Sequence, residues 1–362
     1  MLRLSEAAER LDPRKFIGVV GGQAVSLYRL QHANGMEVAI CNLGAKVLQW
    51  RVPNRHGAKT DVVLGYDSLP GVLAGSPSMG AFIGRYAGRI GQARYTLDGI
   101  DYHLPANAGE HSIHGGPRGS RHRVFNVLQH SSDSLVLGLR FEPSLDGHPG
   151  VVDLTLTYRL TEEGTLVIEH EAVAPENQET SDVPSPVSFT PHLFFNLDGS
   201  EGASVDAHSL EVMADKILDC DADGVATGDC LSLAGHHLDL RQPRCLADMP
   251  DVDHAFELRS TQDLPEPRWA ARVHSKVSGH SLSIHTTEPV LQVYTCAALG
   301  AGSNPDVGKQ GRLHRPRMAL CLEPQRYPNA MNCPPFPVLR VMPGQPYRAR
   351  TEYYFNRTGT CP

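Results

Sequence analysis

The sequence of 362 residues lacks the features that mark several large classes of protein. Basic residues are not in excess, because 40 acidic side chains stand against 33 lysines and arginines and leave a net charge of −7. A nucleic-acid backbone or an anionic membrane surface is normally bound by a basic face. We therefore expect neither nucleic acid nor a membrane as a partner.

Long apolar runs are missing as well. No stretch approaches the roughly 20 apolar residues of a membrane helix, and acidic residues interrupt the opening MLRLSEAAERLDPRKF before any run of signal-peptide length. The eight cysteines, at positions 41, 220, 230, 245, 296, 321, 333 and 361, are irregularly spaced and form no C-x-x-C motif. Such spacing predicts neither a disulfide framework nor a zinc site. We expect a cytoplasmic protein with reduced thiols and no secretory signal.

Common metal and nucleophile motifs are also absent. There is no H-E-x-x-H and no G-x-S-x-G. His111 and His114 are possible metal ligands, but no carboxylate or cysteine stands at a matching spacing, so we predict no metal. DCDADG (219–224) begins like a calcium loop, yet its twelfth position is Cys230 where a bidentate carboxylate is needed. We interpret it as a polar turn.

The pattern that is present is the alternation typical of β-strands. Apolar residues alternate with polar ones over 154–160 and again over 166–170, and the turn-like TEEG separates the two runs. Similar short runs recur at 62–66, 134–141, 209–214, 282–287, 290–295 and 346–355. The clearest helix candidate is the short SEAAERL (5–11). With 27 prolines and 34 glycines and no regular alternation of strands with long helices, the chain is predicted to be all-β, a sandwich or a barrel.

Four segments place polar groups inside otherwise apolar strings, at 80–99, 112–119, 187–199 and 319–332. In SIHGG, two glycines follow His114 and let a ligand approach the backbone closely. A structural histidine at a strand end is the alternative.

His192 and Glu323 stand out in the other strings. His192 precedes Phe194 and Phe195, and aromatic faces commonly stack on sugars; a buried core histidine is the alternative. Glu323 follows four uncharged residues at the end of an apolar run. Burial raises the pKa of a carboxyl and makes it a usable base near neutral pH, unless Glu323 forms a structural salt bridge, for example with Arg326.

Together these segments resemble the aldose 1-epimerase (galactose mutarotase) family. The resemblance runs along almost the whole chain, through CNLGAKVLQWRVPNRHG, DVVLGYDSL, GRYAGRI, IHGG, DGHPG, HLFFNLDG, VDHAFEL, CLEPQRYPNAMN and VMPGQPYRARTEYYF. It implies a large, mostly antiparallel β-sandwich, the galactose mutarotase-like supersandwich, with a sugar site in an open cleft. We expect residues 1–362 to form a single domain of this kind.

The resemblance also implies roles for five residues. Glu323 matches the base that removes the proton of the anomeric hydroxyl, and His192 matches the acid that protonates the ring oxygen. His114 matches a second histidine that polarises the sugar. Arg89 and Asp253 match residues that hold sugar hydroxyls. One base and one acid suffice to open and reclose a hemiacetal, so the expected enzyme is an isomerase of a free monosaccharide that needs no cofactor. We expect it to be a monomer or a homodimer.

The sequence departs from the family pattern at five positions. Gly88 stands where the family usually has the asparagine before the site arginine, so one contact to a sugar hydroxyl is expected to be missing or replaced. Pro191, Phe125, His148 and Asn329 also replace residues common in relatives. We expect all five to bear on which sugar fits.

Two other functions remain open on the same fold. A hexose-6-phosphate 1-epimerase needs basic side chains for the phosphate, and GPRGSRHR offers Arg118, Arg121 and Arg123, which we interpret as a solvated loop. A non-catalytic sugar-binding or sensor protein is the third reading. It does not require the acid–base pair Glu323 and His192.

Overall fold

The computed structural model describes residues 9–53, 57–176, 183–199, 204–259, 266–302 and 305–356. Most of the predicted helix at 5–11 lies outside these residues, and positions 9–11 are not helical. Cys361 also lies outside them, and the seven described cysteines form no disulfide. No helix among the described residues is long and apolar enough to cross a membrane.

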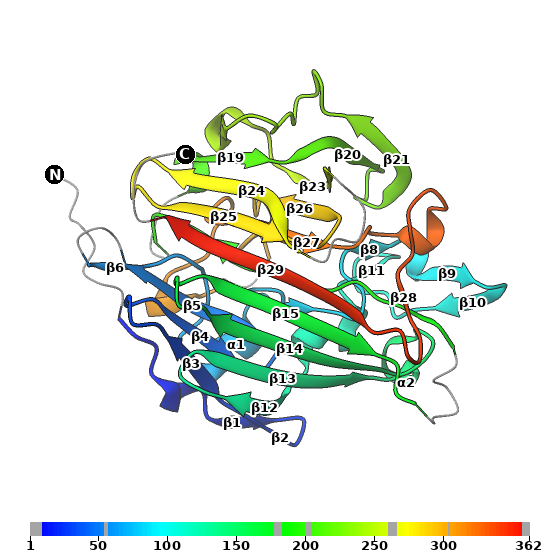
Figure 1. The fold of residues 1–362 in the computed structure, drawn as a ribbon, viewed down its shortest axis with the longest axis horizontal. Helices are drawn as coiled ribbons and strands as arrows, with labels where there is room; N and C mark the ends of the chain where they lie inside the picture. The colour runs from blue at the N-terminus through cyan, green and yellow to red at the C-terminus, as the bar shows by residue number, and fades with distance from the viewer. Residues whose placement is uncertain are drawn as a thin grey trace.

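The largest element is a nine-stranded antiparallel sheet that fills the front of the view in Figure 1. Its strands run in the spatial order β12 (Asn126–His130), β13 (Ser134–Phe141), β14 (Val152–Leu160), β15 (Leu166–Val173), β29 (Tyr347–Asn356), β25 (Ser281–Thr286), β24 (Arg268–Ser275), β19 (His208–Val212) and β22 (Arg244–Cys245). The C-terminal strand β29 pairs with both β15 and β25, so it joins two halves of the sheet that are distant in sequence.

Two further sheets lie behind it. A six-stranded sheet has the order β18 (Phe194–Phe195), β27 (Leu320–Gln325), β26 (Val290–Tyr294), β23 (Asp253–Leu258), β20 (Ala214–Cys220) and β21 (Ala226–Ser232). A four-stranded sheet consists of β3 (Leu27–Gln31), β4 (Glu37–Cys41), β5 (Lys46–Pro53) and β6 (Lys59–Asp61).

Short paired strands, two short α-helices and eight short 3₁₀ helices complete the described structure. The pairs are β1 (Gly18–Val20) with β2 (Gln23–Val25), β9 (Arg94–Leu97) with β10 (Ile100–His103), β8 (Arg89–Ile90) with β11 (Ser112–Ile113), β7 (Phe82–Ile83) with β17 (Thr190–Pro191), and β16 (Ser185–Pro186) with β28 (Arg340–Val341). The α-helices are α1 (Leu69–Ala74) and α2 (Pro143–Asp146).

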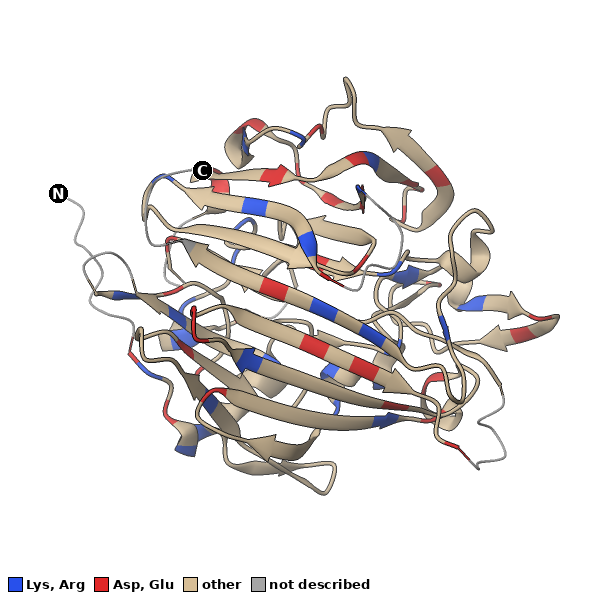
Figure 2. Cartoon of the chain, viewed as in Figure 1, with Lys and Arg blue, Asp and Glu red and all other residues tan. Residues whose placement is uncertain are grey.

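The core lies between the large sheets. Leu156 on β14 belongs to the same buried cluster as Trp50 on β5 and Leu322 on β27. The opposite face of the nine-stranded sheet is polar, and Figure 2 shows charges of both signs along β15 and β29. There Glu169 lies 3.6 Å from both Arg159 and Arg350. One apolar and one charged face explain the strict alternation of these strands.

The predicted all-β, mostly antiparallel fold is confirmed. The runs at 134–141 and 282–287 correspond to β13 and β25 with shifts of at most one residue. The prediction for 62–66 is wrong, because β6 ends at Asp61 and only Val63 makes an isolated bridge, to Phe195. That apolar run is buried where the chain leaves the sheet, and burial alone does not create strand pairing.

Candidate active site

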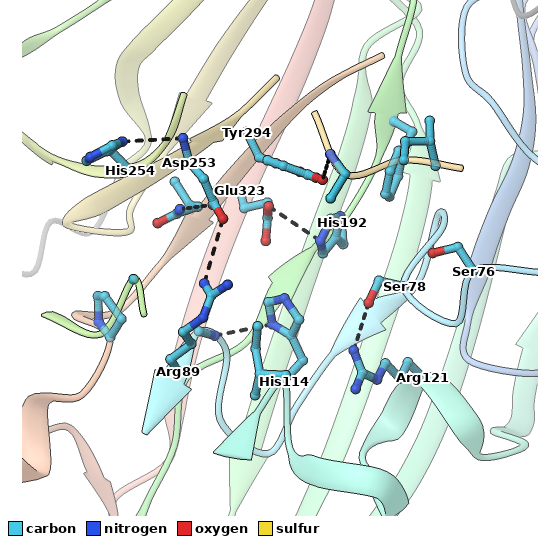
Figure 3. Close-up of a pocket in the computed structure, with 18 of the residues that line it drawn as sticks. Ser76, Ser78, Arg89, His114, Arg121, His192, Asp253, His254, Tyr294 and Glu323 are labelled. Atoms are coloured by element: carbon cyan, nitrogen blue, oxygen red, sulfur yellow. Dashed lines mark hydrogen bonds and ion pairs between the residues drawn. The ribbon is translucent and has the colours of Figure 1, made fainter. Parts of the chain in front are cut away.

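A pocket of about 500 Å³ opens over one face of the six-stranded sheet, within the size range of small-molecule sites. All five residues that the sequence singled out line it: Arg89, His114, His192, Asp253 and Glu323. Figure 3 shows their side chains converging from separate segments of the chain.

Glu323 is positioned by the register of strand β27. It pairs with Gln292 on β26, next to the pairing of Leu322 with Val293. Because side chains alternate along a strand, Leu322 enters the core while Glu323 faces the pocket. Only 2% of Glu323 is exposed, and desolvation, followed by the negative charge of Asp253, raises its pKa well above the ordinary value.

His192 is held beside this carboxyl group by the short strands. Its backbone N–H donates to the carbonyl of Ala81 at 2.8 Å, and its ring stacks on Phe194 with centroids 5.0 Å apart. Its Nε2 lies 3.5 Å from Oε1 of Glu323. Burial, with the positive charge of Arg121 adding to it, lowers the pKa of His192 to about 3.

His114 comes from the segment after β11, which pairs with β8. Its backbone N–H donates to the carbonyl of Gly88, and the N–H of Gly88 donates to Nδ1 of His114 at 3.3 Å. An Nδ1 that accepts leaves the proton of the neutral ring on Nε2. Burial and then His192 lower the pKa of His114 well below its usual value, so the ring is a neutral donor.

Glu323 and His192 together carry one exchangeable proton near neutral pH. A second proton has to charge a buried imidazole, and the loss of the first leaves a buried carboxylate near the negative charge of Asp253. Both events are disfavoured, in agreement with the lowered pKa of His192 and the raised pKa of Glu323. A pair that holds one proton accepts a proton at one atom and releases a proton at the other.

Arg89 and Asp253 form the more open end of the pocket. Nη1 of Arg89 lies 3.7 Å from Oδ2 of Asp253, and the two side chains are 28% and 44% exposed. The side chain of Gln292 donates to Oδ1 of Asp253 at 2.7 Å. These groups leave donors and acceptors available to several hydroxyls, which suits a polyhydroxylated ligand.

Several buried polar atoms in the pocket have no hydrogen-bond partner among the described residues. They are Oε2 of Glu323, Nδ1 of His192, and both Oε1 and Nε2 of Gln325. Leaving such atoms unsatisfied costs about 1–3 kcal/mol each. A polar ligand in the pocket satisfies those that face it.

Sequence reasoning missed Gln325 and Gln292, which also line the pocket, and Arg121, named above only as a possible phosphate ligand, lines it as well. Gln325 follows Glu323 by two positions on β27, so the two-residue period of a strand was a signal for it. Arg121 was interpreted as part of a solvated loop, and that interpretation is wrong because only 7% of it is exposed. Arg118, in the same segment, is exposed as expected.

The five departures from the family pattern do not all reach the pocket. Gly88 lines it, whereas Pro191, Phe125, His148 and Asn329 are not among the described lining residues. His148 instead bonds to a tyrosine hydroxyl at 2.9 Å, and Asn329 accepts from the backbone of a neighbouring loop at 3.0 Å. These four residues therefore do not line the pocket, and the expectation that all five bear on which sugar fits stays a prediction.

His111 does not join His114 in a ligand cluster, because its Nε2 lies 3.5 Å from Asp223. The described residues that do bring metal-type donors together are His114, His192 and Glu323, whose donor atoms lie within 4.8 Å of one another. Because two of these residues, His192 and Glu323, already lie at the 3.5 Å contact described above, we interpret the set as an acid–base group.

Comparisons with known proteins agree along nearly the whole chain. A family model described as aldose 1-epimerase matches residues 26–354. A galactose mutarotase of Rattus norvegicus is 33% identical over 346 residues, 93% of this chain and 95% of that protein. An aldose 1-epimerase of Escherichia coli K12 is 33% identical over 350 residues, 92% and 96% of the two chains. The crystal structure of an aldose epimerase homologue from C. elegans superposes with a TM-score of 0.83 at 29% identity, covering 92% of this chain and 99% of that one.

Proposed function

This chain belongs to the aldose 1-epimerase family, and from that premise we propose that Glu323, His192 and His114 interconvert the α- and β-anomers of a free aldose. The protein is an isomerase of the aldose 1-epimerase type. The observation that carries the residue assignment is the 3.5 Å contact between Nε2 of His192 and Oε1 of Glu323 inside a buried pocket.

Ring opening requires two proton transfers. Glu323 as carboxylate removes the proton of the anomeric hydroxyl, while His192 as imidazolium protonates the ring oxygen. The bond between the anomeric carbon and the ring oxygen breaks, and the open-chain aldehyde forms. Rotation about the bond to the next carbon exposes the other face, and reversing both transfers closes the ring as the other anomer.

The electrostatics of the pocket favour this order. Ring opening leaves Glu323 protonated and His192 neutral, which is the form that a desolvated pocket stabilises. The raised pKa makes Glu323 a stronger base than an exposed carboxylate, and the lowered pKa makes the His192 imidazolium a stronger acid. The pair therefore stabilises the open-chain intermediate.

His114, Arg89 and Asp253 hold the sugar in this proposal. The neutral His114 donates from Nε2, because the amide of Gly88 occupies Nδ1. Arg89 and Asp253 supply a donor and an acceptor for ring hydroxyls at the open end. Gln325 joins them, because its buried amide has no protein partner among the described residues.

The test is the optical rotation of freshly dissolved α-sugars with and without protein, over a panel of free aldoses. We expect acceleration with at least one aldose and a loss of about 10²–10⁴-fold in kcat/KM for Glu323→Gln. Glu257→Gln, a glutamate of the same sheet that does not line the pocket, is the matched control and keeps activity. An unchanged rate in Glu323→Gln excludes this residue as the base, and binding without any acceleration favours a sensor.

The proposal also covers the number of domains and the location in the cell. We propose that residues 1–362 form one domain, supported by the nine-stranded sheet, which combines strands from Asn126 to Asn356. We also propose a cytoplasmic location with reduced thiols, supported by the seven described cysteines, none of which is in a disulfide.

A further inference from the structure

Arg121 is a cation built into the wall of the pocket. It follows the HGG box in a short 3₁₀ turn, Ser120–His122, and only 7% of it is exposed. Nη1 donates to Oγ of Ser78 at 2.8 Å, and Nε donates to Nε2 of His122 at 3.2 Å. Figure 3 shows its side chain at the edge of the pocket, beside Ser78. Both of these partners are neutral acceptors.

No carboxylate compensates this charge within ion-pair distance among the described residues. The pKa of Arg121 is lowered to about 10, with burial as the cause. Lys46, which is 1% exposed, is a second basic group close by. Burial lowers the pKa of Lys46, and the positive charge of Arg121 lowers it further, so Lys46 adds to the excess of buried basic groups. The acidic Asp306 also lines the pocket, but its carboxylate accepts from Tyr66 and pairs with His314.

Arg89, the other arginine of the pocket, is different. It is balanced by Asp253 at 3.7 Å. Burying an unpaired guanidinium costs several kcal/mol unless something else neutralises it. The uncompensated charge of Arg121 therefore points to an anionic group on the ligand.

The charges along the pocket indicate where that group lies. Asp253 and Arg89 are the charged neighbours that act on Glu323, whereas Arg121 and Lys46 act on His192. Figure 3 shows Arg89 and Asp253 on one side of His114 and His192, and Arg121 on the other, in agreement with the effect of both arginines on His114. The order across the pocket is thus Arg89 and Asp253, then the acid–base pair, then Arg121.

A sugar ring bound for the proposed reaction follows the same order. Its anomeric hydroxyl faces Glu323 and its ring oxygen faces His192. The ring oxygen is bonded to the anomeric carbon on one side and to the last ring carbon on the other. The substituent of that last carbon therefore extends past His192, toward Arg121.

We propose that Arg121 is a specificity-determining residue that binds an anionic group on the exocyclic carbon, so that the preferred substrate is an aldose carrying a carboxylate or a phosphate there. This inference rests on the proposed function, because it uses the roles of Glu323 and His192 to orient the ring. Arg121 recognises either anion through charge-assisted hydrogen bonds.

The experiment compares matched sugars in the wild-type protein. Anomer exchange is measured by polarimetry or exchange NMR for glucose against glucose 6-phosphate, and for galactose against galacturonate. We expect kcat/KM for at least one anionic sugar to exceed that of its neutral partner by about tenfold or more, as one charge-assisted contact supplies. The two pairs distinguish phosphate from carboxylate.

Variants then assign the preference to Arg121. Arg121→Gln should lower kcat/KM for the anionic sugar by about 10- to 100-fold and change the neutral sugar by less than about threefold. Arg121→Lys keeps the charge and should retain part of the preference. Arg118→Gln, at the exposed arginine of the same segment, is the control for general electrostatic attraction and should change nothing.

The outcomes separate this inference from the proposed function. If no aldose is accelerated by the wild-type protein, the proposed function fails. If neutral aldoses are accelerated and neither anionic sugar is preferred, the inference is overturned while the function stands. A preference that survives in folded Arg121→Gln also overturns the assignment. The wild-type comparison decides the substrate class even if that variant does not fold.

Discussion

The dependence of activity on pH tests the shared proton of Glu323 and His192 most directly. The pKa of His192 is lowered to about 3, mainly by burial. The change from the ordinary histidine value of about 6.5 corresponds to a bias of about 5 kcal/mol toward the neutral imidazole, at about 1.4 kcal/mol for each tenfold change in proton affinity. Because Glu323 is shifted in the opposite direction, the form with one proton is expected to persist across the neutral range.

This bias sets the expected size of the effect. If both groups had ordinary pKa values, His192 with a pKa of about 6.5 would lose its proton between about pH 6 and pH 8, and the one-proton form that the reaction uses would fall about 25-fold. The shifted pair loses almost nothing over the same interval. We therefore expect kcat/KM to stay constant within about 1.5-fold between these two pH values.

The assay is polarimetry at constant ionic strength, with the spontaneous mutarotation in the same buffer subtracted at each pH. Circular dichroism at both ends of the range verifies that the fold is retained. A decline of about 25-fold toward pH 8 with an intact fold refutes the reasoning, because it shows a histidine that titrates as if it were exposed. A titration with an apparent pKa near that of an exposed glutamate likewise refutes the shift of Glu323.

Four further predictions follow from the same structure. The buried His148 and His170 have pKa values below those of the unfolded chain, so their contribution to stability is present above about pH 6.5 and is lost as the pH falls below it. Urea unfolding should show a loss of about 2 kcal/mol in the free energy of unfolding for each histidine between pH 7.5 and pH 5. An unchanged unfolding midpoint contradicts this. Gln325→Leu should raise KM more than it lowers kcat, because it removes two unpartnered polar atoms that face the ligand, and equal stability of the two proteins is the control. Gly88→Ala should lower the free energy of unfolding by about 1–2 kcal/mol and reduce activity, because Gly88 has φ +81° and an added Cβ lies 2.8 Å from Cβ of Pro328. Thermal unfolding measures the stability and polarimetry the activity. If neither changes, backbone strain at this position is excluded. Exhaustive dialysis against a chelator should leave the rate unchanged, and restoration of lost activity by zinc contradicts the metal-free assignment.

Long strands with one buried face could be predicted from the sequence. The alternation of Leu154, Leu156, Tyr158 and Leu160 follows from the core on one side of β14 and solvent on the other. Two-residue strands such as β7, β8, β11, β17 and β18 could not be predicted, because no period is measurable over two residues. Their positions depend on pairing between segments far apart in the chain, such as Thr190 with Ile83.

The site was predictable where a polar residue interrupts an apolar string. Glu323 and His192 stood out in this way, and the structure places them 3.5 Å apart. Arg121 was named as a possible phosphate ligand, but its burial could not be predicted, because a basic residue among Gly, Ser and His has the composition of a surface loop. Its burial depends on Ser78 and on the walls of the pocket, which the chain supplies from elsewhere.

The register of β27 has a consequence for how this protein can vary. Glu323 alternates with Leu322 on a strand paired on both sides, so a single inserted or deleted residue there exchanges the base with a core side chain. The turn at 221–224 and the segment that holds Ser78 border the same pocket outside any paired strand. Libraries that randomise these segments can explore new sugars without altering the proton transfers. Length changes in β27, by contrast, remove recognition and chemistry in one step.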